Sequence, residues 1–158
     1  PRSTLRHTLF PYTTSSDLLS WLTVLGRLAL AVALGAAIGV ERELSEKAAG
    51  LRTNMLVSLG AALTVLVPIQ SGLVVEDPSA LGRTLQGVIT GVGFIGAGSI
   101  LQKSRVRGLT SAAAVWVSAS LGIAMGLGQW KLALTGVALT LMILRLMKLL
   151  EERISRHL

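Results

Sequence analysis

Charged side chains crowd into one short stretch directly after a long apolar run. Glu41, Arg42 and Glu43 come first, and Glu46 and Lys47 follow. If a helix continues through this stretch, Glu43 and Lys47 can pair because residues four apart share a face, whereas Glu41 and Arg42 cannot face the same way. The pattern fits a solvated turn and a buried network of ion pairs equally well.

A second polar stretch is wholly basic. Its cations are Lys103, Arg105 and Arg107. These cations are suited to hold an anionic lipid headgroup, but anchoring at the inner face of a membrane requires basic residues as well, and we favour anchoring. After a turn at Gly108, Thr110 or Ser111 is expected to cap the next helix.

Arg27 is the only charged side chain well inside an apolar run. A charge at that depth is costly in lipid and indicates either a function or a structural anchor, and we weigh the two equally. Trp21 lies six residues earlier, about 9 Å along a helix, so Arg27 can extend outward to water. Asp17, Glu76 and Asp77 are candidate partners on that side.

Other kinds of chemistry have no residues to carry them. The chain has no Cys, its two His are His7 and His157 near the ends, and no Asp or Glu falls in the middle of an apolar run. Thiolate sites, histidine bases and carboxylate proton or metal pathways are therefore not expected. We predict no cofactor, no metal site and no catalysis.

One glycine motif matches a nucleotide-binding pattern only in its letters. Gly91, Gly93 and Gly96 are spaced as G-x-G-x-x-G. A dinucleotide site needs a preceding strand and an acidic residue about 20 positions later, and neither is present in this uncharged apolar run. With Gly98, these glycines instead predict a helix that is locally flexible or closely approached by a neighbour.

The elements that must position these residues are membrane helices. Of the 158 residues, 51% are hydrophobic and 15% are charged, against about 25% charged in soluble chains. Spanning a bilayer takes about 20 apolar residues. Five runs qualify: residues 18–40, 54–75 with an end near Ile69, 84–101, 109–128 and 131–150. The first run also resembles a signal peptide, but its length and Arg27 favour a span.

We therefore predict an all-α polytopic bundle of five transmembrane helices. Residues 1–17 form an external segment, 18–150 the transmembrane domain and 151–158 a cytoplasmic tail. Ten Lys and Arg residues flank one side of these spans and four flank the other, which places the N-terminus outside and the C-terminus inside. The net charge of +7 is explained by this asymmetry, and nucleic acid is not expected as a partner.

Small residues recur at every fourth position along three of the runs. The sets are Ala31, Gly35 and Gly39; Gly87 and Gly91; and Ala114, Ser118, Gly122 and Gly126. Such faces allow helix backbones to approach closely, within the chain or in a homodimer, and we favour packing within the chain. Trp116 is expected to fill a packing gap. Polar residues within the runs are expected mostly to bond between helices; they are Gln86, Thr90, Ser99, Ser118, Ser120, Thr135 and Thr140.

Several segments together resemble the MgtC/SapB family of bacterial inner-membrane proteins. They are Arg27-Leu28 through Gly35, Ile38-Gly39-Val40-Glu41-Arg42-Glu43, Lys47-Ala48-Ala49-Gly50-Leu51-Arg52-Thr53, Gly91 to Gly98 with Ile100, and Gly108-Leu109-Thr110-Ser111-Ala112-Ala113 with Trp116. Thr110-Ser111 stands where the family commonly has Thr-Thr. Positions that match the family's motifs are Arg27, Glu41, Arg42, Lys47, Arg52, Thr53, Gly93, Gly96, Gly98, Gly108, Thr110 and Trp116.

The resemblance implies a small membrane bundle linked to adaptation to low magnesium and, in pathogens, to survival inside host cells. It also implies action on other membrane proteins, ATP synthase among them, and some members carry a further C-terminal domain. The leading hypothesis is thus a non-enzymatic module that modulates membrane partners. The alternatives are a transporter or channel for magnesium, protons or a small solute, and a lipid-binding or lipid-modifying protein that uses Arg105 and Arg107.

Overall fold

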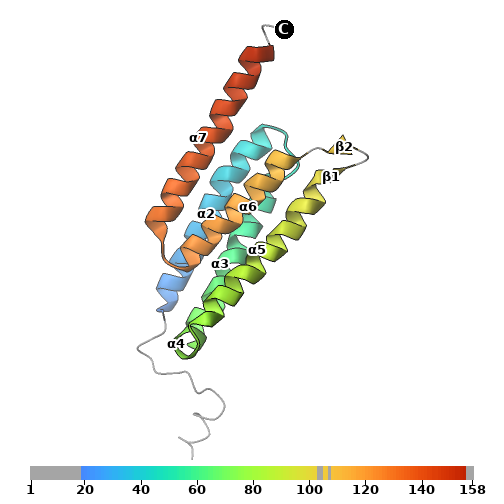
Figure 1. Ribbon diagram of the computed structural model, residues 1–158. Helices are drawn as coiled ribbons and strands as arrows, with labels where there is room; N and C mark the ends of the chain where they lie inside the picture. The colour runs from blue at the N-terminus through green and yellow to red at the C-terminus, as the bar shows by residue number, and fades with distance from the viewer. Residues whose placement is uncertain (1–18, 103–104, 107, 156–158) are drawn as a thin grey trace, which may run out of the picture.

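In the computed structural model, the chain folds into a bundle of helices (Figure 1). The structure describes residues 19–102, 105–106 and 108–155. Within these ranges, the side chains of residues 99–107 and 149–155 are not described. The prediction of a helical membrane protein is confirmed. The helices are α2 (Trp21–Leu44), α3 (Leu51–Gln70), α4 (Leu73–Glu76), α5 (Ser79–Ile100), α6 (Leu109–Gly126) and α7 (Trp130–Ser155). Two short antiparallel strands, β1 (Leu101–Gln102) and β2 (Arg105–Val106), join α5 to α6 and were not predicted.

Four of the described helices are long and apolar enough to cross a bilayer. They are α2, α3, α6 and residues 130–148 of α7. The expected span at 84–101 lies almost wholly within α5, which has 22 residues, of which 79–98 have described side chains. The fifth crossing and the orientation of the bundle stay predictions.

The end of α2 and the cap of α6 differ from what the sequence predicted. Residues 41–43 lie in the last turn of α2, which runs to Leu44 rather than Val40. The α6 helix starts after Gly108, whose φ of 88° is a left-handed conformation that favours glycine. No side chain caps this helix, so the expected cap by Thr110 or Ser111 is wrong; both lie inside the first turn.

The centre of the bundle is built where α2, α3 and α6 pack against one another. A Cβ added to Gly35 on α2 would lie 2.5 Å from the backbone oxygen of Asn54, and one added to Gly122 on α6 would lie 2.1 Å from that of Ser58. These backbones are therefore in direct contact. The small-residue faces of α2 and α6 serve packing within the chain, as we favoured. Gly87 and Gly91 on α5 do not, because a Cβ there would meet nothing within 4 Å.

Large apolar side chains cover much of the outside of the bundle. Leu22 and Phe94 are more than four-fifths exposed, and Ile143 on α7 is 60% exposed, as suits a surface that lies in lipid. Trp116 is 48% exposed. The expectation that it fills a packing gap is therefore wrong, because nearly half of its surface is exposed.

Because neighbouring helices run antiparallel, the connections between them lie at one or the other end of the bundle (Figure 1). The loop 45–50, the β1–β2 pair and the last turns of α7 lie at one end, which we call the basic end. The α4 helix and the α6–α7 turn lie toward the other end. Residues 41–47 are thereby brought close to the start of α6.

Candidate functional site

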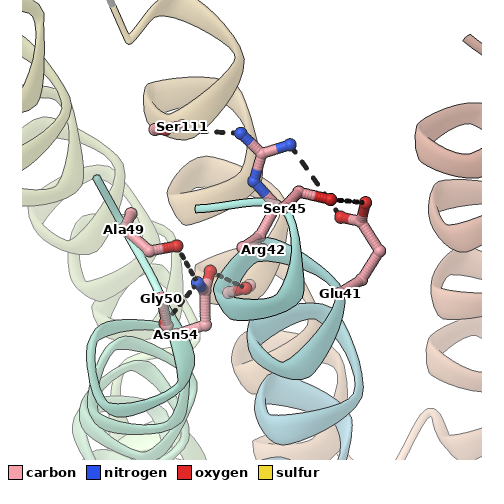
Figure 2. Close-up of polar contacts among 8 residues, drawn as sticks. Glu41, Arg42, Ser45, Ala49, Gly50, Asn54 and Ser111 are labelled. Carbon is pink, nitrogen blue, oxygen red and sulfur yellow. Dashed lines mark hydrogen bonds and ion pairs between the residues drawn. The ribbon is translucent and has the colours of Figure 1, made fainter. Parts of the chain in front are cut away.

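Arg42 is the centre of a polar cluster at the basic end (Figure 2). Although it is charged, Arg42 is only 3% exposed, and its Nη2 donates a hydrogen bond to Ser111 Oγ on α6 at 3.3 Å. Its Nη1 lies 3.9 Å from Oε2 of Glu41. Glu41 Oε1 accepts a hydrogen bond from Ser45 Oγ at 3.1 Å. The expectation that Glu41 and Arg42 point apart is wrong, because their long side chains bend toward each other.

Two buried atoms of this cluster can each form a further hydrogen bond. In the described part of the chain, Arg42 Nε and Glu41 Oε2 are buried without a hydrogen-bond partner. Unsatisfied buried groups of this kind are uncommon and mark places where a ligand or water is to be expected. The first charged stretch is thus a buried site at residues 41 and 42.

The other charged residues of this stretch are exposed, and one of them, Glu43, accepts a hydrogen bond from the start of the next helix. Glu43 Oε2 accepts a hydrogen bond from the backbone N–H of Leu51 at 2.9 Å, which satisfies an end group of α3 that Gly50 cannot cap itself. A Cβ on Gly50 would collide with this carboxylate. The predicted Glu43–Lys47 pair is not formed, because α2 ends at Leu44 before Lys47 can join the same helix face.

Asn54 makes a second buried polar contact, one turn into α3. Its Nδ2 donates to the backbone oxygens of Ala49 and Gly50 at 3.0 and 2.8 Å, and its Oδ1 accepts from Ser118 Oγ on α6 at 2.8 Å. Ser58 Oγ donates to the backbone oxygen of Ala31 on α2 at 2.7 Å. These bonds join α2, α3 and α6. We did not single out Asn54, and its spacing of four from Ser58 was the available signal.

Among the predicted residues whose side chains are described, Ser118 forms an expected bond between helices. Four others donate instead to the carbonyl four residues earlier in their own helix: Thr90, Ser120, Thr135 and Thr140. A hydroxyl can satisfy itself in this way without a neighbouring helix. The side chain of Ser99 is outside the described residues.

Four of the twelve motif positions line one cavity of about 290 Å³ between α2, α6 and α7. They are Glu41, Arg42, Lys47 and Thr110. Arg52 and Thr53 line a separate, open hollow at the start of α3, together with Glu43 and Gly50. The first group therefore joins two segments that are more than 60 residues apart in the sequence.

The other motif positions lie away from this cavity. Gly93, Gly96 and Gly98 are on α5, where a Cβ on Gly96 would meet Ala112 at 3.6 Å and a Cβ on the other two would meet nothing within 4 Å. Gly108 forms the turn before α6, and Trp116 faces outward. Of the proposed lipid contacts, Lys103 and Arg107 are outside the described residues, and the side chain of Arg105 is not described.

Arg27 lies at the opposite end of the bundle. Its Nη1 donates to the backbone oxygen of Gly126 at 2.7 Å, at the C-terminal end of α6, where a cation also offsets the helix dipole. Of its three candidate partners, Asp77 pairs with Arg83 instead, and Asp17 is outside the described residues. No group of three or more His, Cys, Asp or Glu that could hold a metal occurs among the residues with described positions.

Comparison with known proteins identifies relatives over most of the chain. The MgtC family matches residues 28–153. SrpB of Synechococcus elongatus is 45% identical over 84% of this chain and 79% of its own length. MgtC of Salmonella typhimurium is 43% identical over 80% of this chain but 52% of its own length. "Putative magnesium transporter YhiD" of Escherichia coli is 40% identical over 81% of this chain and 62% of its own length.

No solved structure matches the chain. The alignments cover about half of MgtC and under two thirds of YhiD. The family match, in contrast, extends from α2 into the last turns of α7 and takes in the cavity and the polar contacts of Asn54. The chain belongs to the MgtC family.

Proposed function

We propose that this chain is an inner-membrane protein that acts in adaptation to low magnesium by modulating other membrane proteins, without catalysing a reaction. The link to magnesium is supported by family membership and by the name of YhiD, which refers to magnesium transport. The role on partners is supported by one structural contrast, between a closed centre and an open groove.

The closed centre is the contact between α2, α3 and α6. Its helix backbones touch at Gly35 and Gly122, and buried hydrogen bonds from Ser58 and Ser118 join them. A centre of this kind favours a fixed arrangement of the three helices over one that opens for a solute.

The open groove of about 420 Å³ lies between α3 and α5. Its floor contains Gly60, Gly87 and Gly91, where an added Cβ would meet nothing within 4 Å. Small residues at a lipid-facing groove let a helix of another protein approach closely. The proposed occupant is a transmembrane helix of a membrane partner; ATP synthase, suggested by the family resemblance, is one candidate, and a second copy of this chain is the competing outcome.

The proposal includes a topology of five crossings with the N-terminus outside and the basic end in the cytoplasm. The α5 helix has 22 residues, which corresponds to about 33 Å at 1.5 Å per residue and matches a bilayer core of about 30 Å. It packs beside α6 and α3, both of which qualify as spans. The excess of Lys and Arg at the basic end supports a cytoplasmic location.

Growth at low magnesium tests this function in cells that lack the native protein. Glu41→Ala and Arg52→Ala are expected to abolish complementation while the bundle stays folded, with Glu46→Ala as the control because Glu46 is exposed in the loop between α2 and α3. Circular dichroism of the purified variants checks folding. Full complementation by both Glu41→Ala and Arg52→Ala contradicts the proposal.

A transporter or channel is the second candidate, and the name of YhiD is the observation that favours it. In that mechanism Arg27 and the glycine-rich α5 would be the moving parts. Magnesium and proton flux into liposomes that contain the purified protein separates the two functions. We expect flux no greater than in protein-free liposomes, and a specific flux that Arg27→Ala removes would favour the transporter.

A further inference from the structure

The cavity between α2, α6 and α7 carries more positive than negative charge. Among the residues with described side chains, three cations line it: Arg42, Lys47 and Lys148. Glu41 is the acid among its lining residues, and its carboxylate already lies 3.9 Å from Arg42 and accepts a hydrogen bond from Ser45. The two lysines therefore leave a net positive charge available for an anion.

The buried guanidinium of Arg42 adds a donor that nothing in the described part of the chain uses. Arg42 is only 3% exposed, it lines this cavity, and its Nε has no hydrogen-bond partner among the described residues. Guanidinium N–H groups are well matched to the oxygens of phosphate groups.

The start of α6 adds further donors on the same side. Thr110 lines the cavity from the first turn of α6, and the first bond of that helix runs from Ala112 N to Gly108 O. The N–H groups that precede this bond have no acceptor within the helix, and the helix dipole makes this end partly positive. Phosphate groups bind at helix N-termini for these reasons.

Apart from Lys148, the α7 side chains that line the cavity are apolar, and two of them are exposed. Ile143, Leu144 and Met147 line it, and Ile143 and Met147 are 60% and 46% exposed. A second hollow of about 190 Å³ adjoins it, shares Glu41, Ser45 and Lys148 and adds Arg145. A lipid could thus place its phosphate among the cations and its acyl chain along α7.

We propose that the cavity between α2, α6 and α7 binds a phosphate group, from an anionic phospholipid headgroup or from free inorganic phosphate. The proposal does not depend on how the protein acts in magnesium adaptation. Lys47 and Lys148 contact the phosphate from its exposed side, and Arg42 from its buried side.

Native mass spectrometry of the delipidated full chain tests the proposal, with dioleoylphosphatidylglycerol as the probe and dioleoylphosphatidylcholine as the neutral comparison. The Lys47→Gln/Lys148→Gln variant is expected to bind phosphatidylglycerol about twenty-five-fold more weakly, from about fivefold for each cation near a membrane surface. These exposed lysines are used because Arg42→Gln would also remove the bond to Ser111. Arg52→Gln/Lys131→Gln removes two charges outside the cavity and is expected to bind as the wild type does.

The result identifies the source of the phosphate. Phosphatidylglycerol binding that the lysine variant loses and the control retains assigns the site to a lipid. Binding of inorganic phosphate with the same dependence on the two lysines, without phosphatidylglycerol, assigns it to the free ion. Equal binding of both probes by the wild type and the lysine variant, or no binding of either, overturns the proposal.

Discussion

Ser118 on α6 donates a hydrogen bond of 2.8 Å to Asn54 Oδ1 on α3, although the two residues are 64 positions apart in the sequence. Both are fully buried. Since Asn54 also donates to two backbone oxygens that end the preceding loop, this one side chain ties α6 to the start of α3. The contact therefore stabilises the arrangement of α3, α6 and the loop before α3 at the basic end.

Asn54→Ala is therefore expected to destabilise the folded protein by about 2 kcal/mol, because it removes these bonds and leaves the buried Ser118 hydroxyl without its acceptor. Thr64→Ala is the control, since the Thr64 hydroxyl is exposed and bonds within α3. Thermal unfolding in detergent, followed by circular dichroism, measures the difference. Equal midpoints for Asn54→Ala and Thr64→Ala would show that the contact contributes nothing.

Gly122→Ala is expected to destabilise the bundle by about 3 kcal/mol or more, because its Cβ would lie 2.1 Å from the Ser58 backbone oxygen and force α3 and α6 apart. Gly87→Ala provides the matched comparison on α5. Its Cβ meets nothing within 4 Å, and alanine favours the helix by up to about 1 kcal/mol. The same unfolding measurement applies, and a Gly122→Ala protein as stable as Gly87→Ala would refute the close packing of the helices.

Glu43→Ala is expected to lower stability by about 1 kcal/mol, since the Glu43 carboxylate satisfies the Leu51 N–H at the start of α3. Hydrogen exchange of the first turn of α3 is expected to become faster. Glu46→Ala removes an exposed carboxylate of the loop that follows α2 and serves as the control. Unchanged exchange at Leu51 in Glu43→Ala would argue against this cap.

Asp77, in the connection before α5, is expected to titrate at an unusually low pH. Hydrogen bonds from the Ser79 hydroxyl and from Arg83 lower the pKa of Asp77 from 3.8 to about 2. Because folding lowers this pKa, the ionised carboxylate contributes stability above pH 3.8, and this contribution is lost as the pH falls toward 2. NMR titration is expected to show a higher pKa in Ser79→Ala; a value near 3.8 in both proteins would contradict these bonds.

The positions of the helices could be predicted because lipid demands about 20 apolar residues for each crossing. The predicted end of the second run near Ile69 agrees with α3, which ends at Gln70. The end of α2 could not be predicted in this way. Its last turn is charged, and this turn is stabilised by the hydrogen bond that Arg42 donates to Ser111 on α6.

The candidate site was only partly predictable for the same reason. The family resemblance pointed to Glu41, Arg42, Lys47 and Thr110, but only folding shows that they share a cavity. The contribution of Lys148 depends on how α7 lies against α2 and α6, which no local pattern encodes. The position of Trp116 could not be predicted either, because a bulky residue within an apolar run can face lipid as easily as the core.

Cysteine labelling tests most directly whether the chain crosses the membrane five times with the basic end inside. The chain has no Cys of its own, so Glu46→Cys in the loop after α2 and Gln129→Cys in the turn before α7 each give a single exposed thiol. With an impermeant maleimide, we expect Gln129→Cys to be labelled in intact cells and Glu46→Cys only after permeabilisation. Labelling of both positions from one side would show that α5 does not cross, and the reverse pattern would place the basic end outside.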